Sequence, residues 1–347
     1  MDSLSQIILG AAVGEVVLGK KIGNKAMVWG AVGGTIPDLD ILASPFLSEI
    51  ESLAFHRGIS HSIFFSIVAA VLLGYLIFKF ERWLSSKRST ELNTHLRDWQ
   101  WLFFWCLLTH PLLDCFTMYG TQLFAPFSNY RVAFSTVAVA DFFYTIPFAA
   151  CLIIATRFQR TDNKRRYWTW AGIIWSCFYL LLTFFNKQHV TSIYEAQLHA
   201  KGVNTERMIV GPTILSNFLW NATVETDDIY LQGQYSNFDS SPIIFSEIPK
   251  NRNLIPDSKN DKTIQTLRWF SDDYFNVIKR SDGSLQMNDL RFGTFSGEGS
   301  NENDFIFRFA LNRKSDGSYN MSKAEGGPPR GEEMEMLPRL WERIKGR

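Results

Sequence analysis

Hydrophobic residues are distributed unevenly along this chain of 347 residues. Residues 1–185 hold long apolar runs with charges confined to short segments, whereas residues 186–347 alternate polar and apolar positions, as soluble domains do. Four stretches of the first part approach the roughly 20 residues that a membrane-spanning helix needs. They are Ser62–Phe80, Trp99–Met118, Thr136–Thr156 and Trp168–Phe185. We therefore predict a membrane α-helical bundle joined to a soluble domain.

Two shorter apolar segments, Leu4–Gly19 and Ala26–Ile41, precede these stretches. Each contains two glycines four residues apart, a spacing that lets helices approach closely. These pairs are Gly10 with Gly14 and Gly30 with Gly34. We predict a helical hairpin that either spans the membrane or enters it part-way, which makes four to six spans in residues 1–185.

The second part of the chain predicts a small α+β or mostly β domain over residues 186–325, followed by a tail over residues 326–347. A short helix is expected at 190–200, and Asp282-Gly283 is typical of a hairpin turn. Gly326-Gly327-Pro328-Pro329 predicts a break before the tail. Strands are expected at 229–235, 243–248, 263–270, 274–279, 285–295 and 305–311.

Basic residues alternate between successive connections of the apolar part. They gather in residues 20–25, 79–97 and 157–166, whereas the connection at 119–135 has only Arg131. The positive-inside rule therefore places the three basic connections in the cytoplasm. The domain over residues 186–325 is then extracytoplasmic, and the protein is a multi-pass protein of the cytoplasmic (inner) membrane.

The whole-chain composition excludes some classes of partner. The net charge is +1, so no general basic field indicates nucleic-acid binding. The cysteines, Cys106, Cys115, Cys151 and Cys177, have the spacing of neither a zinc knuckle nor a disulfide framework, and we interpret them as packing residues. The first residues lack a basic segment, so we expect no cleavable signal peptide.

The strongest chemical signal is His110 with Asp114, deep in an apolar segment. Residues four apart lie on one face of a helix, and burying them in hydrocarbon is costly, so a functional pair is expected. The alternative is a polar pair that only bonds a neighbouring helix. His56 and His61 lie in a polar cluster. Either both side chains point into one pocket, or the cluster is a surface loop. In that cluster Ser60 or Ser62 is a candidate helix cap.

Asp38 and Asp40 complete the set of candidate ligands. In an extended stretch, alternate residues face the same way, so both carboxylates should lie together. One would bind metal or serve as general base. Arg57 is a candidate for stabilising negative charge on a phosphoryl or acyl oxygen. Weaker candidates are Glu15 and His189 as ligands and Asp141 as an anchor for a ligand.

Six side chains are predicted to converge on one membrane face: His56, His61, His110, Asp38, Asp40 and Asp114. Three His with carboxylates suit a divalent metal, best zinc, and six candidates leave room for one or two ions. The catalytic candidates are Asp38, Asp40 and Arg57. We predict a metal-dependent hydrolase of a phosphoester or lipid-type substrate. The alternatives are an ion or proton transporter, an adaptor, and a metal that only pins the helices.

These motifs resemble the YdjM-type family of membrane-bound, predicted metal-dependent hydrolases. The resemblance rests on Pro37-Asp38-Leu39-Asp40, on His56-Arg57-Gly58-Ile59-Ser60-His61-Ser62, and on Thr109-His110-Pro111-Leu112-Leu113-Asp114 followed by Thr117 and Gly120. It covers roughly the first half of the chain. The family often has a His shortly after the start, where this chain has Gln6. The resemblance further implies a distant likeness to zinc-dependent phospholipase C and related nucleases, hence phosphoester or lipid substrates.

Overall fold

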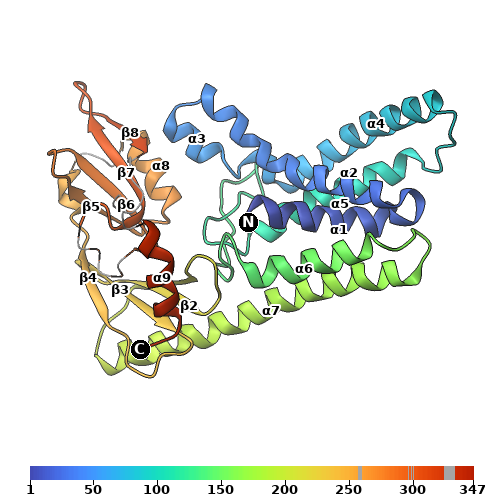
Figure 1. Ribbon diagram of the computed structural model, residues 1–347. Helices are drawn as coiled ribbons and strands as arrows, with labels where there is room; N and C mark the ends of the chain where they lie inside the picture. Colours follow the sequence, from blue (N-terminus) through green and yellow to red (C-terminus); the bar gives the residue numbers. More distant parts are fainter. Residues whose placement is uncertain (257–259, 296, 298, 300, 324–332) are drawn as a thin grey trace. The chain divides into compact units, whose positions relative to one another are not determined.

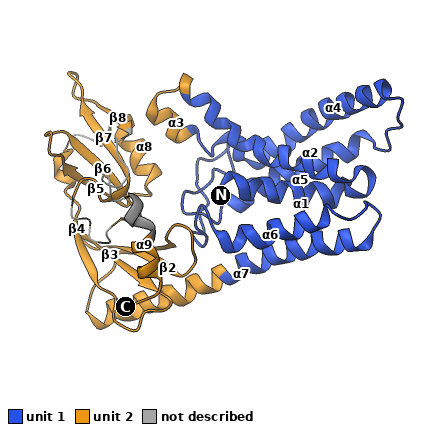
Figure 2. Ribbon diagram, in the orientation of Figure 1, with its two compact units in different colours: residues 1–44, 55–182 blue, residues 45–54, 183–347 orange. Residues whose placement is uncertain are grey.

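The computed structural model describes residues 1–256, 260–295, 297, 299, 301–323 and 333–347. It divides into two compact units (Figures 1 and 2). We call them the helical unit, Met1–Ser44 with Phe55–Leu182, and the β unit, Pro45–Ala54 with Thr183–Arg347.

The helical unit is built from neighbouring antiparallel helices, with long connections between α2 and α4 and between α5 and α6 (Figure 1). Its elements are α1 (Ser3–Ile22), α2 (Asn24–Thr35), the 3₁₀ helices η1 (Ile36–Phe46) and η2 (Ile59–His61), α4 (Ile63–Lys87), α5 (Leu96–Asp114), α6 (Phe142–Ala155) and the first part of α7 (Asn163–Ala200). The end of η1 and most of α3 (Glu49–Phe55) belong to the β unit. Ser62 caps α4 by accepting a hydrogen bond from the backbone N–H of Phe65, as its position predicts.

Within the described residues, three helices are long and apolar enough to cross a membrane: α1, α4 and α7. The predicted number of four to six spans is therefore not confirmed. α2 has 12 residues, about 18 Å of helix, and α6 has 14, both short of the ~30 Å hydrocarbon core. The segment predicted at 136–156 becomes helical only at Phe142, because Asp141 caps the helix there.

α1 and α2 form the hairpin that the glycine spacing predicts. The two helices cross where their glycines meet, so that backbone packs on backbone. A Cβ added to Gly30 would lie 2.8 Å from the Cα of Gly14, and one added to Gly34 would lie 3.0 Å from the Cα of Gly10. Neither distance is compatible with a side chain. The close approach therefore depends on glycine at these positions.

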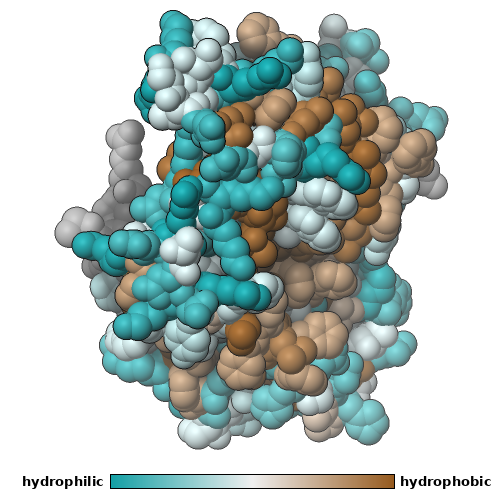
Figure 3. All heavy atoms as spheres, turned by 90° about the vertical axis from the view of Figure 1, so that its right-hand side faces the viewer, coloured by the Kyte–Doolittle hydropathy of each residue, from teal (hydrophilic) through white to brown (hydrophobic). Residues whose placement is uncertain are grey.

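The basic connections lie together at one end of the helical unit, where ion pairs join the hairpin to three other helices. Lys21 pairs with Asp98 of α5 (Nζ–Oδ2 2.6 Å), and Lys25 pairs with Glu81 of α4. Glu15 of α1 binds Arg165 of α7 through both carboxylate oxygens, at 2.5 and 2.6 Å. Figure 3 views this end, with hydrophilic residues in teal among hydrophobic ones in brown.

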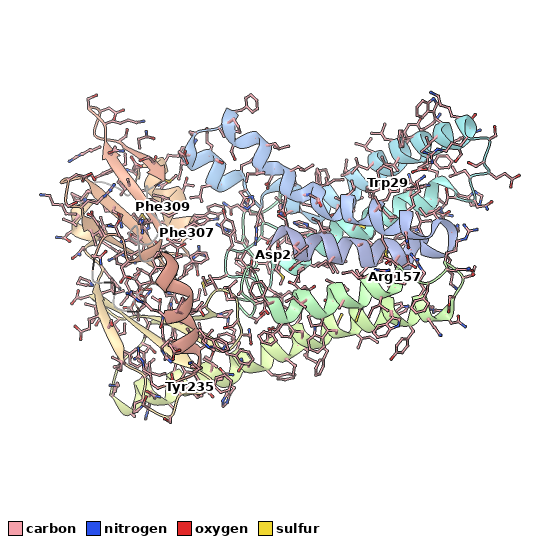
Figure 4. The ribbon with its side chains drawn as sticks, viewed as in Figure 1. Asp2, Trp29, Arg157, Tyr235, Phe307 and Phe309 are labelled. Atoms are coloured by element: carbon pink, nitrogen blue, oxygen red, sulfur yellow. The ribbon has the colours of Figure 1, made fainter. Side chains whose placement is uncertain are left out.

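The β unit contains two four-stranded antiparallel sheets, each with its strands in sequence order. The first holds β1 (Arg207–Pro212), β2 (Leu219–Glu225), β3 (Ile229–Ser236) and β4 (Phe245–Pro249); the second holds β5 (Phe275–Lys279), β6 (Leu285–Thr294), β7 (Phe305–Arg313) and β8 (Tyr319–Lys323). Thr223 and Gln232 of the first sheet both donate hydrogen bonds to the carbonyl of Leu290 in the second. Side chains on β7 pack in rows, among them Phe307 and Phe309 (Figure 4).

Most predicted strands of the β unit are present, and Asp282-Gly283 forms the expected turn, with Gly283 at a φ of 84°. One prediction is wrong: residues 263–270 form helix α8 (Lys262–Phe270), not a strand. Its buried residues Ile264, Leu267 and Phe270 follow a helical period of three. The predicted break at 326–329 lies outside the described residues. The tail contains helix α9 (Glu333–Ile344), whose Arg343 binds Asp239 of the β unit.

Candidate metal centre

Four potential metal-binding side chains meet at the end of the helical unit opposite the basic connections. Asp38 comes from η1, His61 ends η2, and His110 and Asp114 come from the last turn of α5. One ligand atom from each lies within 4.8 Å of the other three. Figure 4 marks this end of α1 by Asp2 and the opposite end of the unit by Arg157. Residues that are 76 positions apart in the sequence thus form one polar cluster.

The two imidazole rings point their Nε2 atoms at each other, 3.2 Å apart. His110 Nδ1 lies 2.6 Å from the carbonyl oxygen of Gly34, so this nitrogen must carry the proton and donate. Its Nε2 is then a lone pair that faces the cluster. Because Gly34 is held by the hairpin packing, the same contact fixes the ring orientation, as partners outside a metal site commonly do.

His61 has the same arrangement. Its Nδ1 lies 3.0 Å from the Ser60 hydroxyl, which itself donates to Asp40 Oδ2 at 3.0 Å. The hydroxyl oxygen therefore accepts from Nδ1–H, and Nε2 of His61 is left as a lone pair. Burial opposes protonation of this ring, but the nearby carboxylates of Asp114 and Asp38 outweigh burial and raise the pKa of His61. The pocket thus favours a positive charge.

Asp114 is fully buried, and its two oxygens have different surroundings. Oδ1 accepts a hydrogen bond from Gln6 Nε2 at 2.9 Å and also contacts the backbone nitrogen of Met1. Oδ2 has no hydrogen-bond partner and lies 3.4 Å from His61 Nε2 and 3.6 Å from His110 Nε2. Gln6 stands where the family often has a His, and it is therefore a site residue through its contact with Asp114, although it was not among the candidate ligands. A polar side chain inside an apolar segment is a further signal for it.

Asp40 and His56, the other two predicted ligands, lie outside the group of four. His56 Nδ1 is 3.0 Å from Asp40 Oδ1, and Asp40 Oδ2 accepts from the backbone N–H of Arg57 at 3.0 Å. Asp40 therefore holds the loop that carries both histidines. The His56 side chain is 34% exposed and packs edge-on against Tyr119.

Arg57 lies beside the cluster with a buried guanidinium. Its Nη1 donates to the Thr117 hydroxyl at 2.8 Å, and its Nε is 3.3 Å from Asp114 Oδ2 but makes no hydrogen bond. The plane lies over the Tyr119 ring, 4.9 Å from its centre. The backbone of Arg57 has a φ of 57°, which costs a non-glycine residue ~1–2 kcal/mol. Strain of this kind tends to gather at functional sites.

The weaker candidates have other partners. Glu15 forms the buried ion pair with Arg165 at the far end of the unit. Asp141 accepts hydrogen bonds from the backbone N–H groups of Phe143 and Tyr144 and from the Tyr179 hydroxyl, so it caps α6. His189 is exposed on α7 in the β unit.

The donor set fits a divalent metal ion. Two facing imidazole lone pairs and an unpartnered buried carboxylate oxygen repel one another unless a cation lies between them. Two His and two Asp suit zinc and similar first-row ions. The contacts described above orient His61, His110 and Asp114 toward one another, and Asp38 Oδ1 lies 3.4 Å from both Nε2 atoms, so the site is formed in the folded chain.

Comparison with known proteins identifies the family of the part of the chain that holds this centre. Residues 1–190 match the family model described as YdjM inner membrane protein, which confirms the resemblance seen in the motifs. "Uncharacterized protein YfhP" of Bacillus subtilis (strain 168) is 28% identical over 165 residues, which cover 44% of this chain and 46% of that protein. The match thus spans about half the length of this relative. No solved structure matches the chain.

Proposed function

This chain belongs to the YdjM inner membrane protein family, and on that premise we propose that it is an integral membrane hydrolase dependent on a divalent metal, most favourably zinc. Asp38, His61, His110 and Asp114 would hold the ion. The observation that carries the proposal is the pair of Nε2 atoms that face each other at 3.2 Å beside the unpartnered oxygen of Asp114. A bound ion satisfies these atoms together.

The chemistry we propose is hydrolysis of a phosphoester. A divalent ion would supply Lewis acidity and make a water easier to deprotonate. The Asp40–His56 pair lies next to the cluster and is the partly exposed group that would accept the water's proton. Arg57 would bind an anionic oxygen of the substrate, because it has an unused N–H beside Asp114.

The arrangement along the bundle supports a site rather than a conduction pathway. The four donors gather at one end of the helical unit, and the basic connections gather at the other. From the positive-inside rule we propose that the centre lies toward the extracytoplasmic face and that the β unit is on the same side of the membrane. A hydrolytic centre there would meet substrates of the outer leaflet.

Metal analysis of the purified protein tests the proposal. We expect bound zinc or manganese that is lost in His61→Ala and in His110→Ala but retained in the matched surface variant His189→Ala. A metal ligand that is removed should also lower the melting temperature, because metal binding and folding are coupled. Unchanged metal content in both ligand variants would contradict the assignment of the site.

The hydrolytic part needs a separate measurement. The metal-loaded protein in detergent is assayed with bis(p-nitrophenyl) phosphate, a water-soluble phosphodiester, and hydrolysis should stop on chelation and return when metal is restored. Metal retained without cleavage of any phosphoester would favour a structural metal instead.

A further inference from the structure

The more exposed side of the centre is bordered by apolar side chains. Asp38 is the most exposed of the four donors, at 21% of its side chain. In a 3₁₀ helix, side chains three positions apart lie over one another, so Ile41 continues the face that carries Asp38. Ile41 is 63% exposed, and Leu39 and Leu42 beside it are exposed as well. A substrate that reaches Asp38 from this side therefore passes an apolar surface.

A second segment next to the centre has the same character. In the connection at 119–135, Phe124 and Phe127 are exposed, Phe127 at 84%. This connection is joined to the site loop, because the backbone N–H of Gln122 donates to the carbonyl of Arg57 at 3.0 Å. Neither segment belongs to a membrane-spanning helix. Exposed apolar groups of this size indicate contact with another apolar phase. We call Leu39, Ile41, Leu42, Phe124 and Phe127 the apolar rim.

The charge of the loaded centre complements an anion. The carboxylates of Asp38 and Asp114 would balance a divalent ion, and the Arg57 guanidinium lies beside them as a positive charge. The guanidinium is buried and has an Nε–H without a partner. A phosphoryl group matches both the ion and this arginine. The apolar rim and the positive charge beside the centre together match a ligand with an anionic head and a hydrocarbon tail.

We propose that the substrate is a membrane phospholipid, bound with its phosphoryl group at Arg57 and the metal centre and its acyl chains against the apolar rim. This inference rests on the proposed hydrolytic function. In the reaction, the oxygen of water forms a bond to phosphorus and the phosphorus–oxygen bond to the leaving alcohol breaks. The alcohol takes up one proton of the water, and the other is released from the phosphoryl product to solvent.

The test compares two substrates on the full-length, metal-loaded protein reconstituted in vesicles. The lipid arm follows hydrolysis of phosphatidylglycerol, and the soluble arm follows bis(p-nitrophenyl) phosphate. The rim variant Ile41→Ser with Phe127→Ser is compared with the control pair Val28→Ser with Tyr167→Ser, two exposed residues outside the rim. We expect the rim variant to lower the ratio of lipid to soluble kcat/KM about tenfold or more, since each buried methylene contributes ~0.8 kcal/mol. The control pair should keep the wild-type ratio.

A binding readout separates recognition from turnover. Retention of a phosphonate analogue of phosphatidylglycerol, in which carbon replaces the oxygen of the scissile bond, is measured by native mass spectrometry. Retention of this analogue at a fixed lipid concentration should fall several-fold in Arg57→Gln and in the rim variant but not in the control pair.

The outcomes distinguish the two proposals. Cleavage of the soluble ester without cleavage or preferential retention of the lipid would overturn the phospholipid assignment and leave the hydrolase standing. Cleavage of neither substrate would overturn both. Equal losses in the rim variant and the control pair would show that the rim is an ordinary lipid-facing surface and would likewise overturn the assignment.

Discussion

Asp38 and Asp40 are separated by one residue, yet the structure gives them different neighbours. Asp38 faces the two Nε2 atoms, whereas both oxygens of Asp40 are engaged with His56 and the backbone of Arg57. We therefore expect Asp38→Asn to lose metal. Asp40→Asn should retain it at saturating zinc while turnover falls ~10²-fold or more, the effect of removing general-base assistance. Metal content and hydrolysis of a soluble phosphodiester are measured on each variant, with Asp162→Asn as the control.

The reverse result, with metal lost only in Asp40→Asn, would exchange the two roles.

At this scale the sequence predicted the four donors but could not separate them from Asp40 and His56. Polar residues in apolar surroundings are visible in a sequence, because their burial needs a reason. The expectation that both aspartates face one way assumed an extended backbone. In the 3₁₀ helix that is present, residues two apart point in directions ~120° apart. Local backbone geometry thus decided which carboxylate enters the cluster.

The hairpin of α1 and α2 connects packing to the metal centre, because the carbonyl of Gly34 orients His110. An added methyl on Gly30 meets backbone atoms of α1, which cannot move aside without separating the helices. We expect Gly30→Ala to destabilise the fold by ~1–3 kcal/mol and to weaken metal binding. Thermal unfolding and chelator competition measure the two effects. Val28→Ala, exposed on the same helix, should show neither.

Metal affinity unchanged in a destabilised Gly30→Ala would show that the two helices and the centre are not coupled.

In the β unit, a buried carboxylate on β2 makes stability depend on pH. Burial acts to raise the pKa of Glu225, but hydrogen bonds from Arg207 and Lys250 outweigh it and lower this pKa. A lowered pKa contributes stability that is present above ~4.3, the ordinary value for glutamate, and is lost as pH falls through the folded-state value. Glu225→Gln should therefore lower the melting temperature at pH 7 more than at pH 3.5.

The exposed Glu206 supplies the control, since Glu206→Gln should change the melting temperature little at either pH. A Glu225→Gln effect that grows as pH falls would contradict this assignment.

Elements with strong periodicity were predictable, and those that depend on distant partners were not. The alternating pattern of β6 and β7 located both strands. Residues 263–270 were predicted as a strand, but Asp261 caps a helix there by accepting from the backbone N–H of Ile264. β1, β2 and β8 were not predicted. β2 is buried along its whole length and lacks alternation.

For the whole molecule, the predicted topology can be tested by labelling single cysteines with a membrane-impermeant maleimide in intact and permeabilised cells. Ser86→Cys and Thr161→Cys lie in basic connections and should be labelled only after permeabilisation. Ser315→Cys, exposed in the β unit, should be labelled in intact cells. The parent chain with its own cysteines gives the background.

Labelling of all three positions under the same condition would place the β unit and the basic connections on one side and would contradict the topology.

The division into an apolar helical part and a soluble β part was evident from the hydropathy pattern, and the boundary between the units falls at residues 182–183. The pattern could not show that residues 45–54 belong with the second part. That short segment follows Asp38 and Asp40 in the sequence. It belongs to the β unit because it contacts residues far along the chain.

The ion pair between Glu15 and Arg165 has a consequence for biogenesis. The two residues are 150 positions apart, and both are buried in the finished protein. During synthesis Glu15 reaches the membrane long before its partner exists. An unpaired carboxylate is costly in hydrocarbon, so in the meantime α1 must keep it neutral or near the headgroups. The carboxylate of Glu15 on α1 gains its partner only after α7 has been synthesised. We therefore expect a chain that is arrested before α7 to leave Glu15 without the arginine that it binds in the folded protein.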